Sequence, residues 1–197
     1  MNTRIIIAMM AAVARIAAAQ AFNDPELARM LSDGRTREAA VASIVAAGAA
    51  RVPSLLSWTR TPPRGVDRTE LYVGMAEAFG ALRTKEAIPF LVQHISIEPW
   101  ISSPDVWAKP SDVMEERLPA VGALIRIGPE AAKAILSRAW DSMGYNDRLA
   151  ALVVLSRVGE GPEARRFILA ALGEANLERE RAQEALTVLD KRTPPAK

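Results

Sequence analysis

The feature that most constrains this chain is a short motif that occurs four times, in which a turn residue precedes a helical pattern of apolar residues. The turn residues, Gly48, Thr84, Gly128 and Gly161, are separated by 36, 44 and 33 residues. Intervals of this size are typical of stacked helical hairpins. With each turn residue counted as position zero, positions four, seven and eight share one face of the following helix. They hold Val52, Leu55 and Leu56; Ile88, Leu91 and Val92; Ala132, Ile135 and Leu136; Arg165, Ile168 and Leu169.

The composition agrees with an all-α fold that forms a single domain or one short repeat array. Half of the 197 residues are hydrophobic but only 5% are aromatic, so alanine, leucine, valine and isoleucine must form the core. Cores of this kind suit helices that pack closely on one another. The chain contains no cysteine, which excludes disulfides, thiolate metal sites and a cysteine nucleophile.

Residues 1–21 have the order of a secretory signal peptide. A basic residue precedes an uncharged apolar run over residues 5–14, and a small-residue triplet ends at Ala21. We expect cleavage after Ala21, or after Ala14 as an alternative, and a secreted or periplasmic protein. Because Arg15 interrupts a run already shorter than the ~20 apolar residues of a membrane span, a spanning helix is disfavoured. The remaining alternative is an amphipathic first helix of the fold.

Without residues 1–21 the chain is neutral. This segment holds two arginines and no acidic residue, so the remainder has 23 basic and 23 acidic residues. A surface without excess positive charge argues against binding to a nucleic-acid backbone. We therefore predict no nucleic-acid partner and no stable membrane span.

Each copy of the motif is expected to pair a helix before the turn with a helix after it. Gly48 suits the end of the first helix, Thr36 suits its start, and Asn146 or Asp147 suits the start of the fourth pair. The expected pairs cover residues 36–47 and 50–58, 68–82 and 85–96, 112–127 and 129–140, and 146–159 and 162–172. We also expect a capping helix within residues 22–34, a last helix over 176–191 and a disordered tail over 193–197.

Two segments, EAIPFL at residues 86–91 and GPEAAKAIL at residues 128–136, resemble HEAT repeats, especially the short type named after phycobilisome lyases. In that type the turn leads into a helix with proline at its fourth or fifth position, as at Pro53 and Pro89. Over residues 35–192 the resemblance implies a right-handed α-solenoid of about four to five HEAT-like helical hairpins.

Lys133 and Arg166 depart from this pattern because they stand where that proline is expected. The 44-residue interval is also longer than the usual unit. The family includes enzymes that attach bilin chromophores, and a related fold houses alkylpurine DNA glycosylases. Both activities fit a secreted, neutral chain poorly, so the resemblance implies an architecture rather than a reaction.

The sequence shows no constellation typical of an enzyme. His94 is the single histidine, and no metalloprotease, serine-hydrolase or phosphate-loop string occurs. Neighbouring acids such as Glu115 and Glu116 fall where a solvated helix start places them. We predict that the protein is not an enzyme and uses no cofactor or metal.

The second helix of each pair is the better candidate for binding, since the resemblance places these helices on the concave side. With positions four, seven and eight in the core, positions six and ten point to a neighbouring exposed face. Aromatic and arginine side chains are frequent interface anchors. The alternative is that Phe90 and Phe167 pack at the edge of the core. The partner-binding candidates on this row are Trp58, Phe90, His94, Arg138 and Phe167.

The segment of residues 97–110 is a second candidate. It holds three prolines together with Trp100 and Trp107, which is more apolar surface than a solvated loop usually has. One interpretation is a recognition loop at the end of the concave groove. The other, which we prefer, is a flap held across the second and third pairs by the two tryptophans.

Three functions are compatible with these features. The first is a non-catalytic adaptor or scaffold that binds a protein or peptide in its concave groove. The second is a structural or chaperone-like component of a cell-envelope assembly. The third is an unrecognised enzyme or ligand-binding protein that uses His94 and groove carboxylates.

Overall fold

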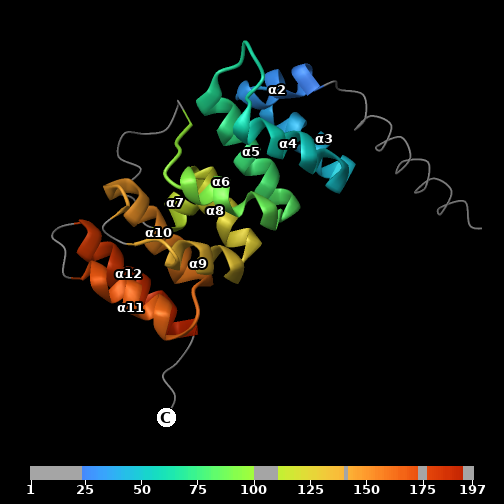
Figure 1. Cartoon of the computed structure of the whole chain (residues 1–197). Coiled ribbons are helices and arrows are strands. Elements are labelled where there is room, and N and C mark those ends of the chain that lie inside the picture. Colours follow the sequence, from blue (N-terminus) through green and yellow to red (C-terminus); the bar gives the residue numbers. More distant parts are fainter. Residues whose placement is uncertain (1–23, 100–110, 140–141, 173–176, 193–197) are drawn as a thin grey trace, which may run out of the picture.

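The computed structural model describes residues 24–99, 111–139, 142–172 and 177–192, and every regular element in these ranges is a helix. The predicted all-α fold class is confirmed. In Figure 1 the helices follow one another from α2 at one end to α11 and α12 at the other. The elements are α2 (Asp24–Ser32), α3 (Arg37–Ala47), the 3₁₀ turn η1 (Gly48–Arg51), α4 (Val52–Arg60), α5 (Arg68–Leu82), the 3₁₀ turn η2 (Lys85–Ala87), α6 (Ile88–Gln93), α7 (Ser111–Arg117), α8 (Pro119–Ile127), α9 (Pro129–Leu136), α10 (Tyr145–Val158), α11 (Gly161–Ala171) and α12 (Leu177–Arg192).

The helices pack in two series that follow the predicted pairs. Those that precede the turns contact one another in order, α3 with α5, α5 with α8 and α8 with α10. Of those that follow the turns, α6 contacts α9 and α9 contacts α11. At the N-terminal end of the described helices, α2 packs on α3 and α5, and at the C-terminal end α12 packs on α10 and α11. α4 differs from the other second helices because its main helical neighbour is α5.

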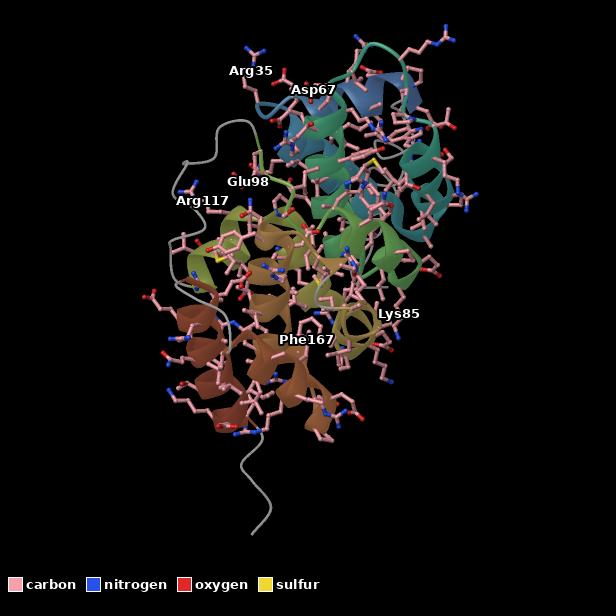
Figure 2. The ribbon with its side chains drawn as sticks, turned by 60° about the vertical axis from the view of Figure 1, so that its left-hand side comes forward. Arg35, Asp67, Lys85, Glu98, Arg117 and Phe167 are labelled. Carbon is pink, nitrogen blue, oxygen red and sulfur yellow. The ribbon has the colours of Figure 1, made fainter. Side chains whose placement is uncertain are left out.

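Position seven of each motif lies in the core, as predicted. Leu55, Leu91, Ile135 and Ile168 are all 0% exposed. Burial of a side chain of this size stabilises the fold by about 1.5–3 kcal/mol. Charged side chains such as that of Lys85 extend instead from the surface (Figure 2).

Positions four and eight of the last copy are not in the core, and the prediction is wrong there. Arg165 is exposed and Leu169 is 44% exposed. In the preceding copy, Leu136 at position eight is half-buried against the core, and α11 packs beside α9. Within the described residues no second helix follows α11, so Leu169 has no such neighbour.

The first helix of the third pair is broken, whereas the sequence predicted one helix over residues 112–127. α7 ends at Arg117 and α8 begins at Pro119. Proline disfavours the helical conformation at the residue before it, and Leu118 accordingly has φ −105° and ψ 98°. The break separates α7 from α8 by this one residue.

One of the two predicted helix starts needs correction. Thr36 occupies the N-cap position of α3, as predicted, although its Oγ1 donates to the carbonyl oxygen of Met30 at 3.0 Å and does not cap the helix. Gly144, not Asn146 or Asp147, occupies the N-cap position of α10.

Two glycines in α5 let neighbouring helices approach closely. A Cβ added to Gly80 would lie 2.7 Å from Cα of Ala123 in α8, and one added to Gly74 would lie 2.6 Å from the carbonyl oxygen of Leu31 in α2. Such distances are far below van der Waals contact, so a larger residue would force the helices apart. Small residues at these crossings therefore set the spacing of α2, α5 and α8.

The stretch Arg37–Arg60 is long and apolar enough to cross a membrane by length and composition. In the fold it comprises α3, η1 and α4, and Gly48 between the two α-helices has φ 62°. Arg51, within the stretch, forms an ion pair with Asp24 of α2 at 3.0 Å between Nη1 and Oδ1. We therefore interpret this stretch as two helices of the stack joined by a turn.

Several predictions concern residues outside the described ranges. They are the signal peptide over residues 1–21, the tail over residues 193–197, and the roles of Trp100 and Trp107. These stay predictions.

Candidate binding site

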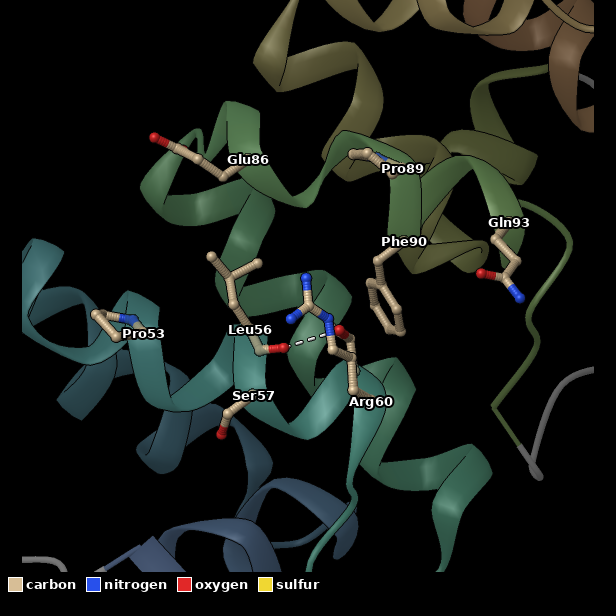
Figure 3. A pocket seen from close by; sticks show the side chains of 9 residues that line it. Pro53, Leu56, Ser57, Arg60, Glu86, Pro89, Phe90 and Gln93 are labelled. Carbon is tan, nitrogen blue, oxygen red and sulfur yellow. Dashed lines mark hydrogen bonds between the residues drawn. The ribbon is translucent and has the colours of Figure 1, made fainter.

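A cavity lies between the second helices of the first two pairs, and we call it the α4–α6 groove. Its volume is about 690 Å³. Figure 3 shows the side chains of α4 on one side and those of η2 and α6 on the other. The groove is lined by Pro53, Leu56, Ser57, Thr59, Arg60, Glu86, Pro89, Phe90 and Gln93.

The two walls of the groove are built from equivalent positions of two copies of the motif. Pro53 and Pro89 both stand at position five, in the first turn of their helices, where the missing N–H leaves no helical hydrogen bond unmade. Both prolines are exposed. The sequence therefore places rigid apolar rings at corresponding points of the two walls.

The groove is lined by apolar and polar side chains together. Leu56 is half-buried and Phe90 is 7% exposed, whereas Arg60, Glu86 and Gln93 are exposed. In Figure 3 the Phe90 ring and the Arg60 guanidinium both extend into the space between the helices. Pockets with this combination bind apolar groups and orient them through a few polar contacts.

A second cavity of about 360 Å³ continues the groove past the start of α4. The two cavities share Pro53 and Glu86. The nine residues of α4 extend over roughly 13 Å, which matches about four residues of an extended peptide. The continuation is lined in addition by Ala49, Val52, Leu82, Arg83 and Thr84.

Trp58, which the sequence placed on an exposed row, is buried. It is 5% exposed and belongs to the core on the same side of α4 as Leu55. The reason is helical geometry, because positions seven and ten are three residues apart and differ by only about 60° around the helix axis. The prediction of an exposed Trp58 is therefore wrong.

Phe90 also packs into the core, while one part of it faces the groove. Its ring centroid lies 5.0 Å from that of Tyr72 and 5.9 Å from that of Phe79, both in edge-on geometry. Phe167 in α11 is likewise half-buried against the core. Of the two interpretations, the structure therefore favours the one in which Phe90 and Phe167 are packing residues at the edge of the core. Of the predicted row, Phe90 alone lines the α4–α6 groove among the described residues.

His94 lies at the end of the same aromatic cluster. Its ring centroid is 4.9 Å from those of Tyr72 and Phe90. Burial, followed by the positive charge of Arg68, lowers the pKa of His94, while the carboxylate of Asp147 opposes this shift. The neutral imidazole is therefore favoured in the folded chain.

The lowered pKa of His94 predicts a pH-dependent stability. Below the unfolded pKa of about 6.5, the unfolded chain takes up a proton that the folded chain resists, so the free energy of unfolding falls as the pH falls from there toward the folded pKa. His94→Gln should flatten this dependence at pH values below about 6.5 in urea melts. Because His94 is the single histidine, no other imidazole contributes. An unchanged slope in the variant would contradict the shift.

Arg138 joins two helix pairs rather than extending freely from the groove face. Its Nη1 donates to the carbonyl oxygen of Val92 at 2.9 Å, and its Nη2 lies 3.9 Å from Oδ2 of Asp147. The hydroxyl of Ser96 donates to Oδ1 of the same carboxylate at 2.6 Å. Arg138 and Asp147 thus connect the end of α6 with α9 and the start of α10.

The described residues contain no group of three or more histidine, aspartate or glutamate side chains arranged to hold a metal ion. His94 packs against the rings of Tyr72 and Phe90. The one carboxylate that acts on it electrostatically among the described residues is that of Asp147, which accepts a hydrogen bond from Ser96 and lies close to Arg138. This arrangement gives no support to the hypothesis of converging acids around His94.

Comparisons with known proteins leave the family open: the chain matches no family model, no curated protein and no solved structure.

The sequence did not predict most of the groove residues, including Leu56, Arg60 and Gln93. Leu56 at position eight was expected in the core. The sequence feature that could have indicated the groove is the proline at position five of the same helix, Pro53, which lines it. The class that the structure supports is an all-helical protein with a groove between two helices.

Proposed function

We propose that the protein is a non-catalytic adaptor or scaffold that binds a protein or peptide along its second helices. We also propose that its helix pairs form a right-handed α-solenoid of the HEAT-like type. The proposal is supported by the order of contacts, since corresponding helices of successive pairs lie beside each other in most of the stack. With the leader predicted over residues 1–21, the proposed place of action is outside the cytoplasm, as a secreted or periplasmic protein.

The observation that carries the proposal is the α4–α6 groove, which combines apolar side chains with exposed polar ones. An extended peptide would place one apolar side chain against Leu56 and the part of Phe90 that faces the groove. The Gln93 amide and the Arg60 guanidinium supply hydrogen-bond donors for the carbonyl groups of such a peptide. The prolines of both walls add rigid apolar contact area.

The test is a substitution that introduces a bulky side chain at a residue lining the groove. Ser57 lines the groove and is exposed, so Ser57→Trp should occupy the groove without disturbing the core. Peptides selected from a random displayed library against the full chain should bind this variant at least about tenfold more weakly, the loss expected when a central anchor is excluded. The affinity is measured by fluorescence anisotropy.

Ala170→Trp is the matched control. Ala170 stands at the same position nine of the motif in α11 and is exposed, but it lines neither cavity of the groove. Its affinity for the peptides should stay within about twofold of the unsubstituted chain. Selected peptides that bind the Ser57→Trp variant as tightly as the unsubstituted chain would show that the groove is not the binding site.

A further inference from the structure

Where one copy of the motif lies beside the next, residues at the same motif positions come together. The four copies give three such junctions. At the first junction, Ala49 and Pro53, at positions one and five, face Glu86 at position two of the next copy. At the third junction, Pro129 and Lys133 hold positions one and five, and Glu163 holds position two. The chain thus presents one kind of notch more than once, each time with a glutamate at its edge.

At the second junction this glutamate already has a partner. Nζ of Lys85, at position one of the second copy, lies 2.5 Å from Oε1 of Glu130, at position two of the third. The hydrogen bond and charge of Lys85 lower the pKa of Glu130. Both side chains are largely exposed, so the pair adds little stability. It shows, however, that an ammonium group placed at position one reaches the glutamate of the following copy.

At the third junction the position-one residue is Pro129, which cannot supply that cation. Within the described ranges neither Glu163 nor the neighbouring Glu160 takes part in an ion pair, and the basic residue that lines the same notch is Lys133. The notch between α9 and α11 has a volume of about 410 Å³, and we call it the α9–α11 notch. Its lining is Pro129, Ala132, Lys133, Leu136, Ser137, Val158, Glu160 and Glu163.

Charge and apolar surface together define what this notch accepts. Two glutamates and one lysine give its lining a formal charge of −1. Ala132, Leu136 and Val158 supply an apolar floor, and the last two are half-buried. The first junction differs, because Arg83 lines it together with Glu86 and leaves its lining neutral.

We propose that the α9–α11 notch binds a lysine or arginine side chain of a protein partner, next to an aliphatic residue of that partner. The cation pairs with Glu163, as Lys85 pairs with Glu130 at the second junction. The aliphatic neighbour and the methylene stem of the basic residue cover Leu136 and Val158, since long basic side chains lay their stems on apolar surface while the charge stays in water. The notch shares no lining residue with the α4–α6 groove.

The first experiment is an NMR titration of the isotope-labelled full chain with capped peptides. The probe is acetyl-Gly-Leu-Lys-Val-Gly-amide, compared with peptides that carry norleucine or glutamate in place of lysine. Amide shifts should centre on Leu136, Val158 and Glu163, and the norleucine peptide should bind about fivefold more weakly, which is the upper range for an exposed ion pair. Equal binding of the lysine and glutamate peptides, or shifts centred on the α4–α6 groove, would overturn the proposal.

The second experiment moves the internal lysine to the third junction. Pro129→Lys places an ammonium group at the position that Lys85 holds in the second copy, so the variant should fill its own notch. We expect its affinity for the lysine peptide to fall about fivefold. Pro129→Ala, the matched control, should leave this affinity unchanged. A Pro129→Lys variant that binds the lysine peptide as tightly as the alanine variant overturns the proposal.

A third variant separates this inference from the proposed function. Ser57→Trp blocks the α4–α6 groove, so the lysine peptide should bind its α9–α11 notch with unchanged affinity. Loss of lysine-peptide binding in Ser57→Trp would place that peptide in the groove and overturn the assignment to the notch. If the selected peptides do not bind the α4–α6 groove, the proposed function is contradicted, while binding of the lysine peptide at the α9–α11 notch is still tested separately by the NMR titration.

Discussion

Replacement of Trp58 by alanine is expected to lower the free energy of unfolding by about 3–5 kcal/mol, the range for a large aromatic removed from a core. Trp58 is 5% exposed and lies with Leu55 on the buried side of α4. The truncation leaves a cavity between α4 and the rest of the core. The measurement is the midpoint and slope of urea unfolding monitored by far-UV circular dichroism.

Arg60→Ala is the control on the same helix. Arg60 is exposed, so its truncation should change the free energy of unfolding by about 0.5 kcal/mol or less. A loss below about 1 kcal/mol for Trp58→Ala would mean that the tryptophan faces solvent. The exposed partner-binding row predicted from the sequence would then be correct at this position.

Leu91→Ala and Ile135→Ala should each lower the free energy of unfolding by about 2–5 kcal/mol. Both residues stand at position seven and are 0% exposed, so the removed methyl groups leave voids that the packed helices fill only in part. The same urea melts measure the effect.

Leu169→Ala is the matched leucine control for this pair. Leu169 stands at position eight of the last copy and is 44% exposed, so its loss should cost less than about 1 kcal/mol. Similar losses for Leu91→Ala and Leu169→Ala would show that the helical register of the second pair is wrong.

Much of the fold follows from the order of apolar runs and turn residues along the chain. The span of α5, Arg68–Leu82, agrees with the prediction at both ends, because a mostly apolar run without proline lies between Asp67, whose carboxylate caps the helix, and the turn at Thr84. Position seven is buried in every copy because it lies on the apolar face of each second helix. The break at Leu118 was predictable in principle, since Pro119 restricts the residue before it.

The candidate site was harder to predict, because it depends on the distance between two helices. The sequence shows which side of α4 is apolar, but it carries no signal for the gap between α4 and α6. Leu56 lines the groove, and α4 has α5 rather than α6 as its main helical neighbour. Trp58 shows the complementary error, in which counting positions from the turn placed a core residue on the outer face.

The position of α4 also has a consequence for motion. Its anchors are the side chains of Leu55 and Trp58 and the polar contacts of Asp24 with Arg51 and Ser54, while the groove separates it from α6. A helix held on one side opens locally at a lower free energy than one enclosed on several, so amide protons of α4 should exchange with solvent before those of α5. A peptide seated in the groove would join α4 to α6, and its binding would be recorded as slower exchange along α4.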